Sequence, residues 1–166
     1  DPAAIPPAGR TEAHAIADPE TTPLGKRVRH LVSHQPAGQS GFLLLDKGEE
    51  ALLWRGMLAD QASRTIDTQY FIWYQDNVGK IAAERLLRAA ERGVRVRVIV
   101  DEISLDADPR FLALLNDHPQ VEIRLYNPVG ALGLDTLGKL GRILGSLGDL
   151  SRLNRRMHNK TFIVDG

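Results

Sequence analysis

The sequence RGVRVRVIVD, residues 92–101, contains the clearest strand pattern in the chain. Side chains alternate between the two faces of a strand, so one face of this stretch carries only the valines at positions 94, 96, 98 and 100. The other face carries Arg95, Arg97 and Ile99. Gly93 is the residue type that commonly follows the end of a helix. The pattern therefore predicts a strand that buries its valines and is entered directly from a helix.

Helices and strands alternate on both sides of this strand. Helices are predicted at about 46–63, 78–92 and 109–118, and further strands at 65–74, 121–126 and 157–165. Asp46 and Glu49 resemble a capping box for the first helix, and Asp108 with Pro109 supplies the cap and first position of the last one. This alternation predicts an α/β fold with a largely parallel sheet.

The first 40 residues read differently from the rest. Prolines at positions 2, 6, 7, 19, 23 and 36 exclude long helices and central strands there. We predict an irregular N-terminal arm over residues 1–40, with a short helix near 25–32, and organised structure over residues 41–166. The chain begins at Asp1 rather than Met, so we expect it to be processed or cut from a longer protein.

Composition narrows the function classes. The formal net charge is zero at pH 7, which argues against a broad electrostatic grip on nucleic acid or anionic membrane. The chain has no cysteine, so disulfides and thiolate metal sites are excluded. No apolar run approaches the roughly 18–20 residues of a membrane-spanning helix. The basic residues that gather between Lys139 and Lys160 fit either an anionic substrate or a solvated loop.

Residues 129–150 contain a leucine–glycine repeat. Leucines 137, 140, 144 and 147 are each followed by a glycine, so a helix here would set a leucine stripe beside bare backbone. Each interior glycine costs about 1 kcal/mol relative to alanine, so such a helix needs close packing against another surface. That surface is either the protein's own core or a lipid surface.

The last nine residues, HNKTFIVDG (158–166), carry the chemistry. In a regular strand His158 and Lys160 share one face, while Asp165 falls on the other. A neutral imidazole beside an ammonium is suited to attack on a phosphodiester, because the lysine pairs with the phosphate oxygens while a ring nitrogen acts as nucleophile. The apolar residues 162–164 favour a buried strand over a solvated sheet edge.

This terminal block resembles the HxKxxxxD signature of the phospholipase D superfamily. Upstream segments strengthen the resemblance: TQYFIW at 68–73, RGVRVRVIVD at 92–101, RLYNP at 124–128 and SRLNRRMH at 151–158. In order, they are similar to the first half of bacterial cardiolipin synthases, most closely those of the C type. The resemblance covers about residues 40–166 and implies a sandwich of helices around a mixed sheet, truncated after this motif.

The resemblance implies a mechanism and a substrate. His158 would be the nucleophile that forms a phosphohistidine, and Lys160 the phosphate clamp, on a phospholipid such as phosphatidylglycerol at a bacterial envelope membrane. Asp165 belongs to the catalytic motif, yet its place in the strand favours a structural role over direct catalysis. No metal or cofactor is implied. The family also places a second such motif in a further half, so we expect this chain to be inactive alone.

Two further polar residues are weaker candidates for substrate binding. Tyr70 and Asp101 lie toward the ends of predicted strands that could face the site. A tyrosine on a strand is more often part of the core, and an aspartate at a strand end is more often a cap. His118 reads as a helix-end residue, and the histidines at 14, 30 and 34 show no metal-like partners.

Two alternatives to a lipid enzyme remain open. The first is a phospholipase D-type nuclease or phosphodiesterase that pairs two single-motif chains as a homodimer. The zero net charge and the leucine–glycine segment argue against a nuclease. The second is a non-catalytic phosphate-binding domain that retains the motif.

Overall fold

The computed structural model describes residues 14–101, 105–106, 108–127 and 156–166. Its helices are a 3₁₀ turn η1 (Pro19–Thr21), α1 (Pro23–Val32), α2 (Gly48–Gln61), α3 (Asn77–Glu91) and α4 (Pro109–Asn116). Its strands are β1 (Thr65–Tyr70), β2 (Trp73–Tyr74), β3 (Arg95–Asp101), β4 (Leu105–Asp106), β5 (Val121–Tyr126) and β6 (Lys160–Val164).

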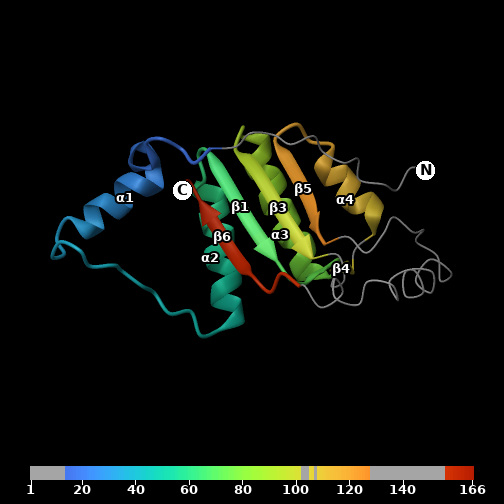
Figure 1. Ribbon diagram of the computed structural model, residues 1–166, viewed down its shortest axis with the longest axis horizontal. Coiled ribbons are helices and arrows are strands. Elements are labelled where there is room, and N and C mark those ends of the chain that lie inside the picture. Colours follow the sequence, from blue (N-terminus) through green and yellow to red (C-terminus); the bar gives the residue numbers. More distant parts are fainter. Residues whose placement is uncertain (1–13, 102–104, 107, 128–155) are drawn as a thin grey trace.

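The main sheet has four strands in the order β5-β3-β1-β6 (Figure 1). β3 pairs in parallel with both β1 and β5, and β6 pairs antiparallel with β1. Parallel neighbours need a crossover, and α3 and α4 lie in the two crossovers. β2 and β4 form a separate two-stranded parallel sheet. The predicted α/β fold with a mixed, largely parallel sheet and flanking helices is confirmed.

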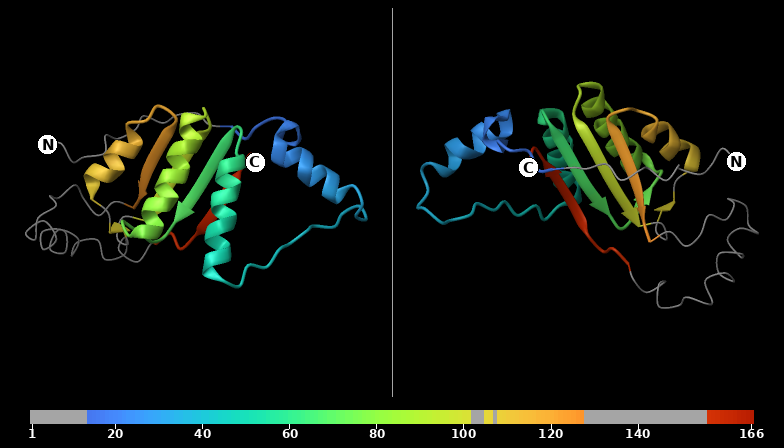
Figure 2. Two further views of the ribbon diagram at one scale, coloured as in Figure 1. Left: turned by 180° about the vertical axis from the view of Figure 1, so that it is seen from behind. Right: turned by 45° about the horizontal axis from the view of Figure 1, so that its top comes forward.

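The core lies between one face of the sheet and the helices. Ile66, Val96 and Val121 form a row across β1, β3 and β5, and all three are buried. The four valines of the 92–101 stretch are at most 3% exposed, as their alternation predicts. α2, α3 and α4 cover this face (Figure 2). Burial of these branched side chains supplies the main stabilisation of the fold.

The opposite face of the sheet is polar. Asp67 pairs with Arg97, and Glu122 pairs with Arg124, along β1, β3 and β5. Among the described residues no helix covers this face (Figure 2). The second helical layer of the expected sandwich is therefore not formed by the part of the chain that the structure describes.

The ends of the helices test the caps that the sequence predicts. Gly93 adopts φ +88° and ends α3, donating to the Ala90 carbonyl at 2.8 Å. The Asp108 side chain caps α4 by accepting from Arg110 N at 2.8 Å. The capping box predicted from Asp46 is wrong, because α2 begins later, with Lys47 at the N-cap and no side-chain cap. Glu49 instead lies in the first turn, where its charge complements the helix dipole.

The strand predicted over residues 65–74 is divided in two. β1 stops at Tyr70, whose neighbours are Val100 on β3 and Lys160 on β6. β3 ends one residue after Val100 and β6 begins at Lys160, so both ladders end here and the chain leaves the sheet. It then pairs with β4 through Trp73 and Tyr74. Phe71 is consequently left at the end of β1, beside the start of β6.

The strand predicted over residues 157–165 is also shorter than expected. β6 begins at Lys160, so His158 precedes the strand rather than lying within it. The physical reason is a long-range contact: the Asp101 carboxylate holds the chain at Arg156 and Met157, so this segment is tied to β3 before it joins β1. β6 is an edge strand of the described sheet, with Ile163 47% exposed, so the prediction of a buried strand is wrong.

The N-terminal region contains a little more regular structure than the prolines suggested. α1 covers the short helix predicted near residues 25–32, and Thr22 caps it by accepting from Gly25 N at 3.0 Å. Residues 36–46 form neither helix nor strand. α1 stands apart from the sheet (Figure 1), and a domain boundary near residue 41 stays a prediction.

Candidate active site

His158 and Lys160 meet at the ring of Phe71. The imidazole ring lies 4.9 Å from the Phe71 ring, centroid to centroid, in an edge-on arrangement. The Lys160 ammonium lies 5.2 Å from the same centroid, within cation–π range. Lys160 Nζ also donates to the His158 carbonyl oxygen at 3.0 Å. Both side chains are exposed, so one aromatic ring presents an imidazole and an ammonium together to solvent.

Asp101 holds the chain just before His158. Its side chain is fully buried, with Oδ2 accepting from Met157 N at 3.0 Å and Oδ1 accepting from Arg156 Nη1 at 3.0 Å. A charge-assisted bond to a backbone amide fixes that peptide strongly. Asp101 therefore sets the position from which His158 projects, and it has no exposed surface with which to touch a substrate.

Asp165 lies at the other end of β6, away from His158. It is 5% exposed, and its carboxylate accepts from the backbone N–H groups of Ser63, Arg64 and Thr65 at 2.8–3.2 Å and from the Ser63 hydroxyl at 2.9 Å. Burial alone would raise the pKa of this carboxyl. The hydrogen bonds outweigh burial, and the pKa lies below its ordinary value. The carboxylate ties the end of β6 to the start of β1.

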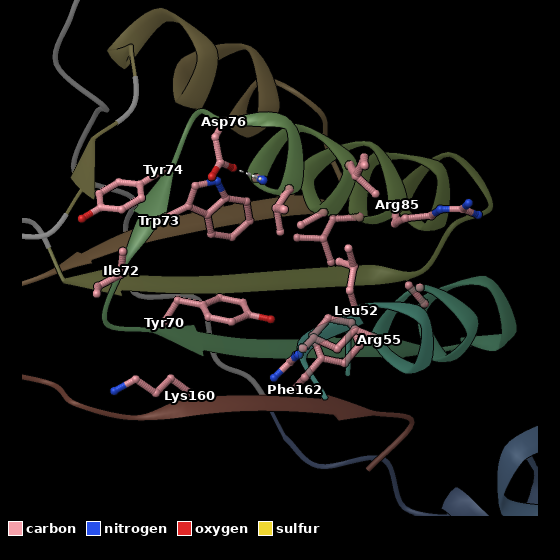
Figure 3. A pocket seen from close by; sticks show the side chains of 18 residues that line it. Leu52, Arg55, Tyr70, Ile72, Trp73, Tyr74, Asp76, Arg85, Lys160 and Phe162 are labelled. Carbon is pink, nitrogen blue, oxygen red and sulfur yellow. Dashed lines mark hydrogen bonds between the residues drawn. The ribbon is translucent and has the colours of Figure 1, made fainter. Parts of the chain in front are cut away.

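Tyr70 lies directly opposite Lys160 in the β1–β6 ladder, so the two side chains leave the same face of the sheet. The Tyr70 ring packs edge-on against Trp73, with centroids 5.6 Å apart. Figure 3 shows the Tyr70 side chain pointing toward α2 and the Lys160 ammonium pointing the other way. A direct contact of Tyr70 with substrate stays a prediction.

Tyr70 and Lys160 both line a cavity of about 330 Å³. α2 and α3 form two of its walls, and β1, β2 and β6 form the remainder (Figure 3). Its lining is mostly apolar, with Leu52, Trp73 and Phe162 among the contributors. Phe71 and this cavity were both missed from the sequence. The adjacent aromatic residues at 70, 71 and 73 were the only signal for either.

Other possible features of a site are few in the described part of the chain. No three His, Asp or Glu side chains there come together in a way that could hold a metal ion. None of its helices has the length and apolar character needed to cross a membrane. The leucine–glycine segment at 129–150 lies outside the described residues, as does most of the basic cluster that starts at Lys139.

Comparisons with known proteins show to which family the chain belongs. No family model matches it. Cardiolipin synthase C of Escherichia coli K12 is 44% identical over 143 residues, which is 86% of this chain. The chain is a homologue of the bacterial cardiolipin synthases. Cardiolipin synthase B of Shigella flexneri is 32% identical over 123 residues, or 74% of the chain. The stretch RGVRVRVIVD and the terminal His-x-Lys block thus belong to a cardiolipin synthase homologue.

The chain covers only part of the length of the cardiolipin synthases that it matches. It spans 28% of the length of cardiolipin synthase C and 26% of that of cardiolipin synthase B. Among solved structures, NucT from Helicobacter pylori gives a TM-score of 0.38 at 17% identity, covering 51% of this chain and 52% of NucT. That likeness is distant.

Proposed function

We propose that this chain is part of a phosphatidyltransferase that acts on phospholipid phosphodiesters at a bacterial envelope membrane, with phosphatidylglycerol or a similar lipid as substrate. The observation that supports it best is the placement of His158 and Lys160 on one aromatic ring, next to a mostly apolar cavity. The homology to cardiolipin synthases over 86% of the chain supports the same reaction class.

The proposed reaction has two steps. A ring nitrogen of His158 attacks phosphorus, a nitrogen–phosphorus bond forms, and the ester bond to the first alcohol breaks while that alcohol takes up a proton from an acid. The acceptor alcohol then gives up its proton, attacks phosphorus and releases the imidazole. Lys160 pairs with the non-bridging oxygens throughout. Positioning and charge stabilisation of this kind are the main requirements of phosphoryl transfer.

The proton donor would come from outside this chain. The sequence contains five histidines, but only His158 stands two residues before a lysine. We therefore assign the acid to a second His-Lys motif in a further half, consistent with relatives more than three times as long. The route through a phosphohistidine requires no metal or cofactor. Asp101 acts as a positioning residue, and Asp165 holds the fold together.

Lys160→Ala tests the phosphate clamp on the chain itself. Removing one charge-assisted contact should weaken binding of glycerophosphoglycerol, the headgroup without acyl chains, by about ten- to a hundredfold. Isothermal calorimetry or ligand-observed NMR measures this. Lys80→Ala is the matched control, because Lys80 is an exposed lysine on α3 outside the site. Equal affinity of the two variants would contradict the proposed clamp.

Asp101→Asn tests the positioning role. In the enzyme that contains both motifs, we expect kcat to fall by about ten- to a hundredfold while KM stays within about twofold, because the amide can no longer accept from both Met157 N and Arg156. The matched control is Asp67→Asn, which breaks an ion pair with Arg97 on the polar face of the sheet. A fall in kcat of the same size in both variants would indicate a general loss of stability instead.

Turnover assays separate this function from its alternatives. The 166-residue chain incubated with phosphatidylglycerol should give no product, because it lacks the proposed acid. Robust turnover by the purified chain would refute the need for a second half. Plasmid cleavage that requires dimerisation of this chain would favour a nuclease.

A further inference from the structure

The cavity next to Lys160 has the walls expected for an aliphatic ligand. Its apolar lining includes Leu52 on α2, Ile81 and Leu86 on α3, and Phe162 on β6. At about 330 Å³ it lies within the roughly 300–1,000 Å³ range of small-molecule sites. Apolar residues continue outward along its rim, where Ile72, Tyr74 and Val78 are 43–53% exposed. Such a rim leaves apolar surface in water unless a ligand covers it.

The charged groups around the cavity favour an amphiphile with an anionic head. The Lys160 side chain lines the cavity, and its ammonium points away from the Tyr70 hydroxyl (Figure 3). That ammonium donates to the His158 carbonyl oxygen at 3.0 Å. Arg55 lines the cavity too, and among the described residues it has no hydrogen bond or ion pair. Arg85 is neutralised by Asp60 at 2.7 Å. One end of the cavity therefore joins the phosphate position, with a second cation available along the wall.

We propose that this cavity binds an acyl chain of the phospholipid whose phosphate lies at Lys160. The inference rests on the proposed function and extends it, because it assigns the apolar part of the substrate to α2 and α3. The exposed lining is mostly apolar, which favours an apolar ligand over a polar one such as a nucleotide, because buried polar groups need hydrogen-bond partners. An acyl chain needs none, and its burial removes apolar surface from water on both sides.

The two tryptophans of the chain allow a direct test. Trp73 lines the cavity and is 6% exposed, whereas Trp54 lies on α2 outside the lining and is 39% exposed. In a Trp54→Phe background, Trp73 is the sole indole. The probe is lysophosphatidylglycerol with a dibrominated stearoyl chain, used below its micelle concentration, because bromine quenches indole fluorescence at contact. Saturable quenching of Trp73, reversed by the unbrominated lipid, is expected.

Gly56 provides the blocking variant. It lines the cavity from α2, and a Cβ built on it meets nothing within 4 Å, so a larger side chain enters open space rather than a wall. Gly56→Leu fills that space and should weaken binding of the brominated lipid by about tenfold or more. Gly56→Ala is the matched control, since it makes the same gain in helix propensity with little added volume, and it should bind as the parent does.

The outcomes are distinguishable from those of the proposed function. Glycerophosphoglycerol has no chain, so its affinity should be unchanged in Gly56→Leu and weakened in Lys160→Ala. Absence of quenching, or equal quenching in the Leu and Ala variants, overturns the acyl site while leaving the phosphate clamp intact. The acyl site is also overturned if the parent chain is a dimer and Gly56→Leu dissociates it, because a second copy of the chain would then fill the cavity. If Lys160→Ala binds glycerophosphoglycerol as tightly as the parent does, while the brominated lipid still quenches Trp73, the proposed function is rejected instead.

Discussion

Replacing His158 with asparagine will abolish the covalent intermediate and the transfer reaction in the enzyme that contains both motifs. Asparagine keeps a polar side chain of similar size but has no basic ring nitrogen, so the nitrogen–phosphorus bond cannot form. Loss of a nucleophile that acts as a unit with its partners typically costs about 10⁴- to 10⁶-fold in kcat. The measurement uses phosphatidylglycerol labelled on phosphorus. The label that becomes covalently attached to the protein is counted, and its release by acid identifies a nitrogen–phosphorus bond.

Asn159→Ala is the control for that experiment. Asn159 is adjacent and exposed, and its side chain donates to Gln69 Oε1 at 3.0 Å rather than lying on the Phe71 ring. It should retain activity within about tenfold, the cost of one exposed hydrogen bond that steadies the start of β6. Labelled intermediate in the His158 variant would show that another residue is the nucleophile, and the site proposed here would be incorrect.

The part of the fold that local patterns encode was predictable. The valine alternation over residues 94–100 required a strand with one buried face, and Gly93 required a helix end immediately before it. Asp108 with Pro109 located the start of α4 to the residue. These signals work because each depends on contacts within a few residues along the chain. The order β5-β3-β1-β6 was not predicted, since strand order depends on which faces meet in space.

The sequence indicated the two candidate residues of the site but not the way in which they meet. His158 and Lys160 stood out as a pair, yet they meet at Phe71 because β1 ends opposite Lys160 and Asp101 holds the chain at Met157. Both causes join residues more than 50 positions apart, so no local periodicity reports them. The same holds for the cavity, whose walls come from α2, α3 and β6. A regular strand through His158 was the simplest expectation, and one buried carboxylate overrides it.

Asp165 is the residue whose removal we expect to cost the most stability at neutral pH. Its carboxylate accepts from three consecutive backbone N–H groups and one hydroxyl, and it is almost completely buried. Because these bonds lower its pKa in the folded state below the ordinary 3.8, the unfolded chain binds the proton more tightly. The stabilisation is therefore complete above the unfolded pKa, at neutral pH, and is lost as the pH falls below about 4 through the folded pKa.

Asp165→Asn should lower the free energy of unfolding by about 2–3 kcal/mol at pH 7, because an amide nitrogen would replace an acceptor that faces N–H groups. Asparagine tolerates the φ of +53° at this position, so the loss reports the carboxylate and not backbone strain. Urea unfolding at pH 7 and at pH 3 measures this loss, and the difference in the free energy of unfolding between variant and parent should be smaller at pH 3. Asp60→Asn, which breaks an exposed pair with Arg85, should cost less than about 1 kcal/mol. A gap of equal size at both pH values would mean that the charge of Asp165 does not hold β6 to the start of β1.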